Sequence, residues 1–432
     1  MTKQKKSKTV SFFTQGCRLN QAESATLERA FEQEGFNIVG FNTSADIAVI
    51  NTCTVTDNAD KDAKRLVRKA AKHNKSVKVA LIGCMAQIQK QALLDWPNVA
   101  WVVGNAQKMQ LPHLIEDPSL EGEALVPKMK KEAFEEPLQG FDRHHVRANI
   151  KVQDGCDFFC SFCVIPFARG PARSRFFYDV LAESKELVKS GHKELVLTGI
   201  NVGTYQDQGK FLLNIVSELD QLENLKRIRI SSIEPTTIDS ALIDKMASKE
   251  SKLCPYLHLP IQSGCDVTLK RMGRKYSLKD YCDFVEDVSS RVPDLCLGTD
   301  VIVGFPGETD DDFECTYQTL ATLPFAYFHV FSYSERHFSR SRKLSDKCSS
   351  TCIAKRSERL RELSKRKQEA FYRNYIGRQC EVLIEQKKEG AWVGLTESFC
   401  KVKCDIPNLK RHDIVTVDIA SLDGPYLVAE KR

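Results

Sequence analysis

Three cysteines lie close together in one short segment, and their spacing constrains the fold more than any other feature. Cys156, Cys160 and Cys163 follow the pattern Cys-x3-Cys-x2-Cys. Cysteine thiolates are the usual ligands of iron–sulfur clusters, and three of them leave one iron of a four-iron cluster open to a small molecule. Zinc is the alternative, but a zinc site usually pairs two short Cys or His doublets, and no second doublet stands nearby in the sequence. The spacing therefore favours a catalytic [4Fe–4S] cluster.

The segment around this motif alternates apolar runs with helix-like stretches. Repeated βα units of this kind predict a partial (βα)6 barrel similar to the TIM barrel, with its chemistry at the carboxyl ends of the strands. Cys156 follows the first run almost directly, as that rule requires. The six runs span 149–153, 194–200, 227–233, 256–261, 295–304 and 326–333.

An earlier alternation fills roughly the first hundred residues. Its apolar runs at 9–13, 47–51, 77–83 and 99–104 are separated by polar helical stretches, which predicts an open parallel sheet flanked by helices. Each of the first three runs ends at or just before a cysteine: Cys17, Cys53 and Cys84. The carboxyl ends of parallel strands meet at one edge of a sheet, so these cysteines could converge there.

Composition shifts suggest four consecutive segments. Residues 112–147 are charged, contain several prolines and show no clear period, which is typical of a linker. Short strand-like runs with Gly or Pro breaks follow residue 378 and predict a small β-barrel. We therefore expect an N-terminal domain at 8–119, a linker at 120–141, the barrel core at 142–372 and a C-terminal domain at 373–432.

Positive charge gathers just before the C-terminal domain. Residues 353–378 carry nine Lys or Arg against three Glu, an excess equal to the net charge of +6 of the whole chain. A helix there would present a basic face. The sequence leaves open whether this face contacts RNA phosphates or is a plain solvated connector.

Composition excludes several classes of protein. With 42% apolar and 28% charged residues, the 432-residue chain is globular and not disordered. Its sixteen cysteines are spread over a long chain without a secretion signal, so we expect free thiols in a reducing, cytoplasmic compartment. No run approaches the roughly 18 apolar residues of a membrane helix, so we expect no membrane partner.

Several motifs together resemble one enzyme family. They are 16–21 (GCRLNQ), 51–56 (NTCTVT), 83–84 (GC), the Cys156 motif and 170–175 (GPARSR). With these motifs the chain resembles the radical S-adenosylmethionine (radical SAM) methylthiotransferases. It is most similar to the branch that acts on N6-threonylcarbamoyladenosine beside the tRNA anticodon. The sister branches, which act on isopentenyladenosine in tRNA and on an aspartate of a ribosomal protein, remain alternatives.

The resemblance implies a complete enzyme. It implies a second [4Fe–4S] cluster on Cys17, Cys53 and Cys84, and two S-adenosyl-L-methionine molecules with different roles. The implied reaction converts N6-threonylcarbamoyladenosine at adenosine-37 to its 2-methylthio derivative by radical C–H activation and sulfur insertion. The C-terminal barrel resembles the TRAM module of RNA-modifying enzymes. The implied partners are the tRNA anticodon stem-loop and an electron donor such as a flavodoxin or ferredoxin.

Five residues at the predicted strand ends are candidate contacts of S-adenosylmethionine. A glycine lets the backbone approach a ligand, amide side chains both donate and accept, and a carboxylate can bind an ammonium or ribose group. Turn capping is an equally good explanation for the carboxylate. The candidates are Gly199, Asn201, Ser232, Glu234 and Gln262.

Three arginines directly after the cluster motif are candidate substrate contacts. Arg169, Arg173 and Arg175 could meet the RNA backbone or the carboxylate of a threonylcarbamoyl group, because Arg binds carboxylates with a planar fork. Surface solubility is the alternative. Two departures from the family pattern, Cys265 and the segment 334–341 without a Gly-Thr pair, make the substrate less secure than the reaction class.

A function of another class also fits the motifs. In a non-catalytic iron–sulfur RNA-binding protein, the clusters would only stabilise the fold. The six βα units and the open iron position favour catalysis instead.

Overall fold

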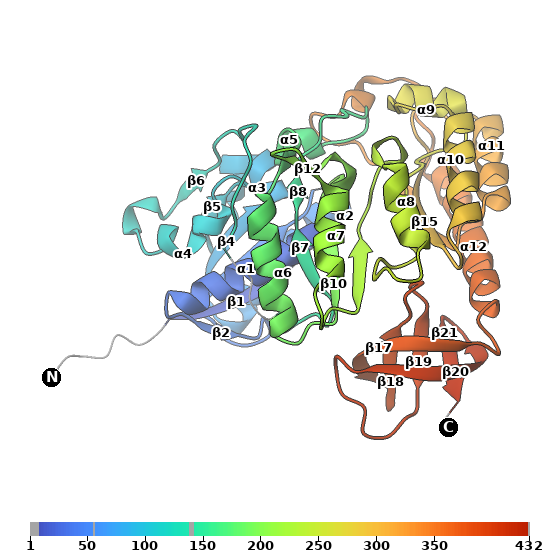
Figure 1. Cartoon of the computed structure of the whole chain (residues 1–432). Coiled ribbons are helices and arrows are strands. Elements are labelled where there is room, and N and C mark those ends of the chain that lie inside the picture. The colour runs from blue at the N-terminus through green and yellow to red at the C-terminus, as the bar shows by residue number, and fades with distance from the viewer. Residues whose placement is uncertain (1–7, 55–56, 138–141, 431–432) are drawn as a thin grey trace.

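The chain folds as three packed parts in sequence order (Figure 1). The structure, a computed structural model, describes residues 8–54, 57–137 and 142–430. An α/β domain comes first, a half-open barrel of strands and helices follows, and a small closed β-barrel lies at the C-terminal end. The fold class expected from the sequence is confirmed.

The N-terminal domain is a six-stranded, fully parallel sheet in the order β2-β1-β3-β4-β5-β6. One apolar cluster, containing Leu27 and Phe31 of α1, covers one face; a second, containing Ala63 and Val67 of α2, covers the other. Its elements are β1 (Thr9–Thr14), α1 (Arg18–Gln33), β2 (Asn37–Val39), β3 (Ile47–Thr52), α2 (Asp57–His73), β4 (Lys78–Gly83), α3 (Cys84–Gln89), β5 (Val99–Val103), α4 (Leu111–Leu114) and β6 (Glu123–Leu125).

The two edge strands were not predicted from the sequence. Both β2 and β6 have three residues, too few to show a period of two. Because β6 pairs in parallel with β5, the sheet runs past residue 119 into the expected linker. That linker is also packed further along, since Phe134 bridges to Arg175.

The central part contains the six predicted βα units. Strands β7, β10 and β13 form one parallel sheet and β14, β15 and β16 another. Parallel bridges from Ile228 to Leu253 and from Ser232 to His258 join the two sheets, which gives an open barrel of six strands. The strands are β7 (Ala148–Lys151), β10 (Glu194–Thr198), β13 (Arg227–Ile230), β14 (Tyr256–His258), β15 (Cys296–Val303) and β16 (Tyr327–Ser332).

Helices cover the outside of this barrel, and several begin at side-chain caps. Ser277 and Asp280 form a capping box at α10, as do Thr309 and Asp312 at α11. The elements between the barrel strands are β8 (Gln153–Asp154), α5 (Ile165–Arg169), β9 (Arg173–Ser174), α6 (Phe177–Lys189), β11 (Gln206–Asp207), β12 (Lys210–Phe211), α7 (Leu212–Asp220), α8 (Ser240–Ala247), α9 (Asp266–Met272), α10 (Leu278–Arg291) and α11 (Asp310–Thr322).

The last helix, α12 (Ser350–Arg373), packs against β16 and leads into a closed five-stranded barrel. The barrel order is β17-β18-β19-β21-β20, with β17 (Gln379–Lys388), β18 (Ala391–Leu395), β19 (Lys401–Cys404), β20 (Ile414–Asp423) and β21 (Tyr426–Glu430). The sequence had not indicated β21. Among the helices that the structure describes, none has the length and apolar character of a membrane span.

Two buried arginines attach the C-terminal barrel to the core. On β13, Arg227 Nη1 donates to the carbonyl of Leu395 at 2.9 Å and Arg229 Nη1 to that of Glu397 at 2.8 Å. Glu194 accepts from Arg229 Nε at 2.7 Å, so the charge is compensated inside the joint. The contact fixes the loop that carries Phe399 against the open end of the core, where the site lies.

Candidate active site

The first cysteine trio, Cys156, Cys160 and Cys163, lies on the loop that follows β8. Three N–H groups point at its sulfurs. Phe158 N lies 3.5 Å from Cys156 Sγ, Ile165 N 3.4 Å from Cys163 Sγ, and Arg274 Nη1 3.5 Å from Cys160 Sγ. Hydrogen bonds to the sulfurs are a usual feature of cluster-binding loops, so the donor set fits an iron–sulfur cluster.

The three cysteines of this trio are half-buried. Burial raises the pKa of Cys156 to about 11 and that of Cys163 to about 12, and the charge of Cys160 adds to both shifts. Mutual electrostatic effects of this kind require the three sulfurs to be neighbours. Metals bind the thiolate form, so loading this loop releases protons.

The second trio comes from three neighbouring strands of the N-terminal sheet. Cys17 precedes α1, Cys53 directly follows β3, and Cys84 begins α3 directly after β4. Gly16, with φ of +96°, presses against Cys53: a Cβ at this glycine would lie 2.9 Å from Cys53 Cβ. Cys84 in turn raises the pKa of Cys17, though less than burial does. The structure therefore brings together the three cysteines that the sequence placed at strand ends.

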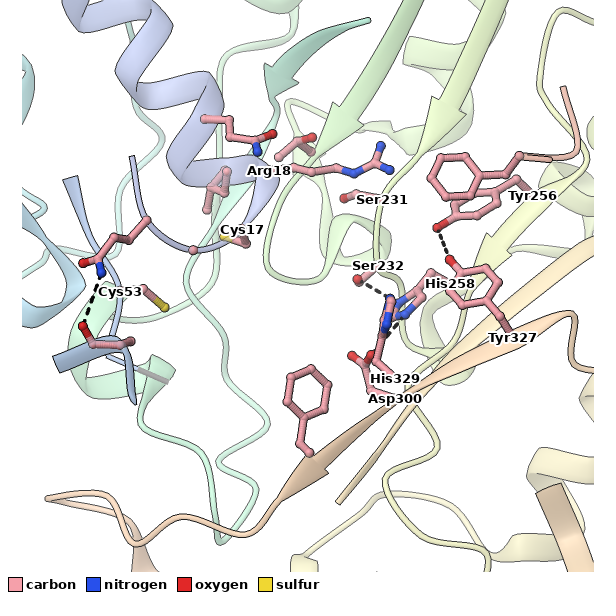
Figure 2. A pocket seen from close by; sticks show the side chains of 18 of the residues that line it. Cys17, Arg18, Cys53, Ser231, Ser232, Tyr256, His258, Asp300, Tyr327 and His329 are labelled. Carbon is pink, nitrogen blue, oxygen red and sulfur yellow. Dashed lines mark hydrogen bonds and ion pairs between the residues drawn. The ribbon is translucent and has the colours of Figure 1, made fainter. Parts of the chain in front are cut away.

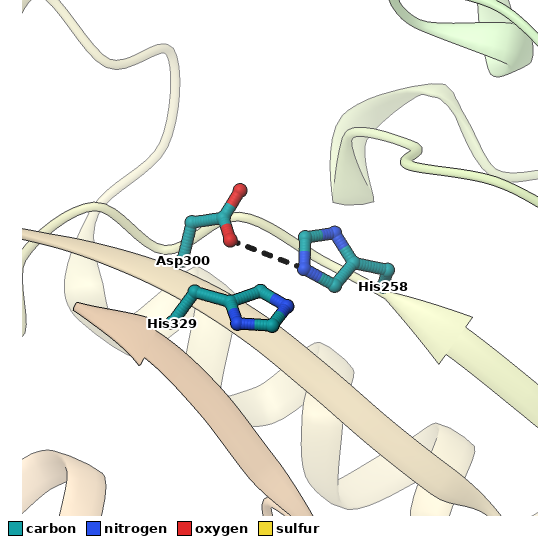
Figure 3. A group of neighbouring side chains, drawn as sticks. All are labelled: His258, Asp300 and His329. Atoms are coloured by element: carbon teal, nitrogen blue, oxygen red, sulfur yellow. Dashed lines mark ion pairs between the residues drawn. The ribbon is translucent and has the colours of Figure 1, made fainter. Parts of the chain in front are cut away.

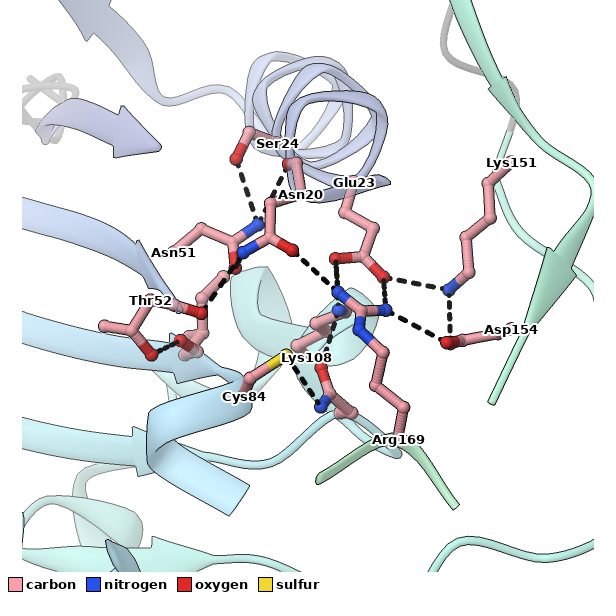
Figure 4. A network of polar contacts seen from close by, with 12 residues as sticks. Asn20, Glu23, Ser24, Asn51, Thr52, Cys84, Lys108, Lys151, Asp154 and Arg169 are labelled. Carbon is pink, nitrogen blue, oxygen red and sulfur yellow. Dashed lines mark hydrogen bonds and ion pairs between the residues drawn. The ribbon is translucent and has the colours of Figure 1, made fainter. Parts of the chain in front are cut away.

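A buried ionic network joins the two trios (Figure 4). Its centre is Arg169, whose Nη1 lies 2.9 Å from Glu23 on α1 and 3.0 Å from Asp154 on β8. Its Nη2 donates to Asn20 Oδ1 at 2.7 Å, and this oxygen lies 3.5 Å from Cys17 Sγ. Asp154 stands two residues before Cys156. One arginine thus connects the positions of both cysteine loops.

The network is close to charge balance. Lys108 and Lys151 also bind Glu23, and Lys151 further binds Glu136 at 2.7 Å and Asp154 at 3.0 Å. These cations lower the pKa of Glu23 and of Asp154 against the effect of burial, which keeps both carboxylates charged. A buried network of this kind holds its members at fixed positions.

A large cavity lies between the second trio and the open end of the core (Figure 2). Its volume is about 1180 Å³, and all three parts of the chain contribute to its wall. Cys163 faces a smaller adjoining cavity of about 170 Å³, and Asp300 and Phe331 line both. Among the residues that line the large cavity are Cys17, Arg18, Cys53, Gly199, Ser232, Tyr256, His258, Asp300, Tyr327, His329 and Phe399.

Three of the five predicted cofactor contacts line these cavities, and the other two lie close to them in sequence. Gly199 and Ser232 line the large cavity, and Gln262 lines the small one beside Cys163. Asn201 accepts from Glu234 N and Thr237 Oγ1, while its buried Nδ2 has no partner among the described residues. An orphaned buried donor two residues after the cavity-lining Gly199 fits a polar ligand such as S-adenosylmethionine.

Glu234 has a partner that the sequence did not indicate. Arg274 Nη2 binds its carboxylate at 2.6 Å while Nη1 of the same arginine reaches Cys160 Sγ. Burial nevertheless raises the pKa of Glu234. Arg274 therefore ties a predicted cofactor contact to the first trio.

His258, Asp300 and His329 form a second polar group on the wall of the large cavity (Figure 3). His258 Nε2 lies 3.2 Å from Asp300 Oδ1, and the Nδ1 atom of the same ring lies 3.0 Å from Ser232 Oγ. One ligand atom from each of the three residues lies within 4.8 Å of the others. The strand ends β14, β15 and β16 thus present polar atoms to one point of the cavity.

The structure corrects the expectation for two of the three arginines. Arg169 and Arg175 are 0% and 1% exposed, and each is held in ion pairs, Arg175 with Glu183. Neither can reach RNA phosphate or a substrate carboxylate, nor does either serve surface solubility. Arg173 is partly exposed but binds Asp154 at 3.0 Å. The sequence could not distinguish a charge that faces solvent from one that closes a domain joint.

Sequence reasoning missed other residues of the site. Arg18, directly after Cys17, lines the large cavity. Phe399 packs on Tyr256 with ring centroids 4.8 Å apart and brings the C-terminal barrel into the wall. The one available signal was for Arg18, a basic residue at the end of a strand beside an expected cluster ligand.

Comparisons with known proteins agree with this site. Residues 150–320 match the family described as the radical SAM superfamily, and residues 9–104 match the uncharacterized protein family UPF0004. The radical SAM methyltransferase TsrM from Kitasatospora setae, solved with cobalamin and a [4Fe–4S] cluster, has a similar fold. The TM-score is 0.55 at 15% identity over 76% of this chain and 75% of that one. The fold and the first trio define a radical SAM enzyme.

Three curated relatives match over almost their whole lengths. A threonylcarbamoyladenosine tRNA methylthiotransferase MtaB from Aquifex aeolicus is 36% identical over 91% of this chain and 96% of its own. The protein of the same name from Bacillus subtilis is 34% identical over 97% and 95%. A tRNA-2-methylthio-N(6)-dimethylallyladenosine synthase from Ehrlichia chaffeensis is 32% identical over 94% and 95%. The chain belongs to the radical SAM methylthiotransferases, transferases that use S-adenosylmethionine and [4Fe–4S] clusters.

Proposed function

We propose that this methylthiotransferase acts on tRNA and converts N6-threonylcarbamoyladenosine at adenosine-37 into its 2-methylthio derivative. The observation that carries the proposal is that each cysteine trio reaches one of two adjoining cavities. Cys17 and Cys53 line the large one and Cys163 lines the small one, while Asp300 and Phe331 line both. Methylthio insertion needs one centre to activate the C–H bond and another to supply sulfur. The names of the Aquifex and Bacillus relatives support the threonylcarbamoyl substrate.

In this proposal each trio holds one [4Fe–4S] cluster. Cys156, Cys160 and Cys163 hold the first, and Cys17, Cys53 and Cys84 hold the second. The bound clusters and S-adenosylmethionine supply the radical and sulfur chemistry. The protein contributes ligands at fixed positions, N–H donors to the sulfurs and the buried network around Arg169 that sets one loop relative to the other.

The strand-end residues orient S-adenosylmethionine. The free Nδ2 of Asn201 donates to it, Gly199 leaves room for it, and Ser232, Glu234 and Gln262 offer polar atoms around it. The Arg274 side chain keeps Glu234 in place beside Cys160. These groups would hold the cofactor at a fixed position near the first trio.

The walls of the large cavity suit a purine. Tyr256, Tyr327 and Phe399 supply aromatic faces on which a base can stack, and they exclude water from the reacting edge. Exposed basic side chains on α12, such as Arg361, Lys365 and Arg373, are available to RNA phosphates beside this cavity. We assign the C-terminal barrel as the RNA-binding TRAM module and a flavodoxin or ferredoxin as the electron donor.

Isopentenyladenosine in tRNA is the second candidate substrate. The Ehrlichia relative, named for dimethylallyladenosine, is nearly as similar to this chain as the Aquifex one. The two substrates differ in the chemistry of the N6 group, which is charged in one and apolar in the other. The residues that contact the N6 group, and not the cysteine trios, should therefore decide which of the two substrates the enzyme accepts.

Nucleoside mass spectrometry of tRNA tests the proposed substrate. A strain that lacks this gene should accumulate N6-threonylcarbamoyladenosine without the 2-methylthio group, and the wild-type gene should restore the modified nucleoside. Loss of methylthio-isopentenyladenosine instead would identify the second candidate. No change in either nucleoside would contradict a tRNA substrate.

A further inference from the structure

Arg18 is a half-buried cation on the wall of the large cavity, and it has no anionic partner among the described residues. It lines the cavity wall, and Figure 2 shows its guanidinium reaching from the Cys17 side toward Ser231 and Tyr256. No carboxylate of the described residues lies within ion-pair distance of it. Its guanidinium carbon lies 5.5 Å from the centroid of the Phe399 ring. A guanidinium that is partly withdrawn from water and has no carboxylate beside it offers its charge to an anionic ligand in the cavity.

The neighbouring arginines do not share this property. Arg147 binds Glu385 at 2.6 Å and Arg229 binds Glu194 at 2.7 Å, although both stack on the same Phe399 ring. Three arginines thus lie around one aromatic ring, and carboxylates of the described residues pair with two of them.

From this geometry we infer that Arg18 binds the carboxylate of the threonylcarbamoyl group of the substrate. The inference rests on the proposed function and names the residue that selects its charged substrate. Arg recognises carboxylates with two parallel hydrogen bonds, and such charge-assisted bonds are strong where water is excluded. The isopentenyl group of the second candidate offers no anion to this site.

The position of Arg18 agrees with the shape of the substrate. In adenine, C2 and C6 both adjoin N1, so the N6 substituent projects from the same end of the ring that carries the reacting carbon. Arg18 directly follows Cys17, a ligand of the trio proposed to supply sulfur. A base held with C2 toward that trio would therefore have its N6 group close to Arg18.

RNA phosphate is the rival anion for this site. Arg18 lies inside the cavity beside Tyr256, Tyr327 and Phe399, where a base fits, whereas the backbone of a stem-loop remains outside. The exposed basic residues of α12 are better placed for phosphates. The carboxylate is therefore the favoured ligand, and a neutral substrate analogue separates the two.

The test compares two substrates on one protein. The anaerobically reconstituted full chain would be given an anticodon stem-loop carrying N6-threonylcarbamoyladenosine, or the same RNA with that carboxylate as its methyl ester. We expect wild type to favour the acid by about 10- to 100-fold in kcat/KM, as a charge-assisted pair implies. Arg18→Gln should abolish this preference by lowering only the turnover of the acid. Incomplete cluster loading affects both substrates equally and cancels in the ratio.

Two variants complete the design. Arg18→Lys keeps the positive charge but loses the planar guanidinium, so it should retain part of the preference for the acid over the ester. Arg29→Gln removes an arginine of the same helix that pairs with Glu32, and it should behave as wild type. Equal losses on acid and ester in Arg18→Gln, or no loss on the acid, would overturn the inference while leaving the proposed function in place. If wild type modified only an isopentenyladenosine stem-loop, the result would contradict the proposed substrate and therefore also the inference.

Discussion

The two cysteine trios reach a similar arrangement by different routes. Cys156, Cys160 and Cys163 lie on one loop, and the backbone N–H groups of that loop already point at two of their sulfurs. Cys17, Cys53 and Cys84 come from the ends of three strands, and the parallel order β1-β3-β4 brings them together. The first site is therefore a local feature, whereas the second exists only when the sheet is folded.

This difference predicts different dependence on the rest of the molecule. The loop of the first trio needs a few local contacts, such as the glycine at 155. The second trio needs the sheet, the joint around Arg169 and the closure of α1 on β7. Substitutions that break the contacts of Arg169 should therefore reduce metal binding by the second trio more than by the first.

The largest effect should come from the cysteines themselves. Cys160→Ala and Cys53→Ala should both reduce methylthio product to background, because each removes a ligand of one centre. They should differ in the cleavage of S-adenosylmethionine: 5′-deoxyadenosine should disappear in Cys160→Ala and persist in Cys53→Ala. Equal loss of 5′-deoxyadenosine in the two variants would show that the trios do not act as separate centres.

Removal of Arg169 should be the next largest effect. Arg169→Met leaves Glu23 and Asp154 short of a buried partner, which should cost about 3–5 kcal/mol of unfolding free energy. The second trio should then bind less iron than the first. Arg175→Met is the matched control, because it breaks a buried pair with Glu183 away from Cys17. Denaturant unfolding and iron content check both variants, and equal iron loss in the two would contradict the role of the joint.

The glycines beside the trios should give a smaller effect. At Gly155, with φ of +72°, a Cβ would lie 2.0 Å from the Pro171 carbonyl oxygen; at Gly16 it would lie 2.9 Å from the Cys53 side chain. In both alanine variants the left-handed backbone conformation should lower the free energy of unfolding by about 1–2 kcal/mol. Gly155→Ala should lose more, because a backbone atom cannot move aside. Thermal unfolding would contradict this if Gly16→Ala proved the less stable protein.

The smallest effect should be a pH-dependent change in stability at the surface between α1 and the segment that follows the linker. His144 Nε2 lies 2.8 Å from Glu28 of α1, and this hydrogen bond raises the pKa of His144. A raised folded pKa adds stability below the unfolded value of about 6.5, and that stability is lost as pH rises through the folded pKa. Because the His144 side chain is 59% exposed, His144→Gln should cost less than about 1 kcal/mol at low pH and nothing at high pH. Urea unfolding at both pH values would contradict the assignment if the cost were larger at high pH.

The same contrast explains what the sequence could predict. The spacing of Cys156, Cys160 and Cys163 was sufficient to indicate a cluster, and apolar periodicity located the four long strands of the first sheet and all six of the core. The ends of these strands then gave the second trio as a candidate set. Edge strands of three residues, β2 and β6, carry too little pattern to be recognised.

The sequence could not show which charged residues pair with each other across the fold. Nothing local separates Arg169, which is buried between Glu23 and Asp154, from Arg18, which faces the cavity. Their environments depend on partners more than a hundred residues away or on the closure of three domains. Burial of a charge is a property of the tertiary fold, so the sequence patterns offered Arg169 and Arg175 as substrate contacts although both are buried in ion pairs.

Metal analysis of the full chain tests the central claim most directly. Iron and sulfide would be quantified on anaerobically prepared wild type and on a Cys17→Ala, Cys53→Ala, Cys84→Ala variant of the same preparation. If each trio holds one four-iron cluster, the variant should keep about half of the iron and sulfide of wild type. Equal iron in the two proteins, or zinc in place of iron, would contradict the account.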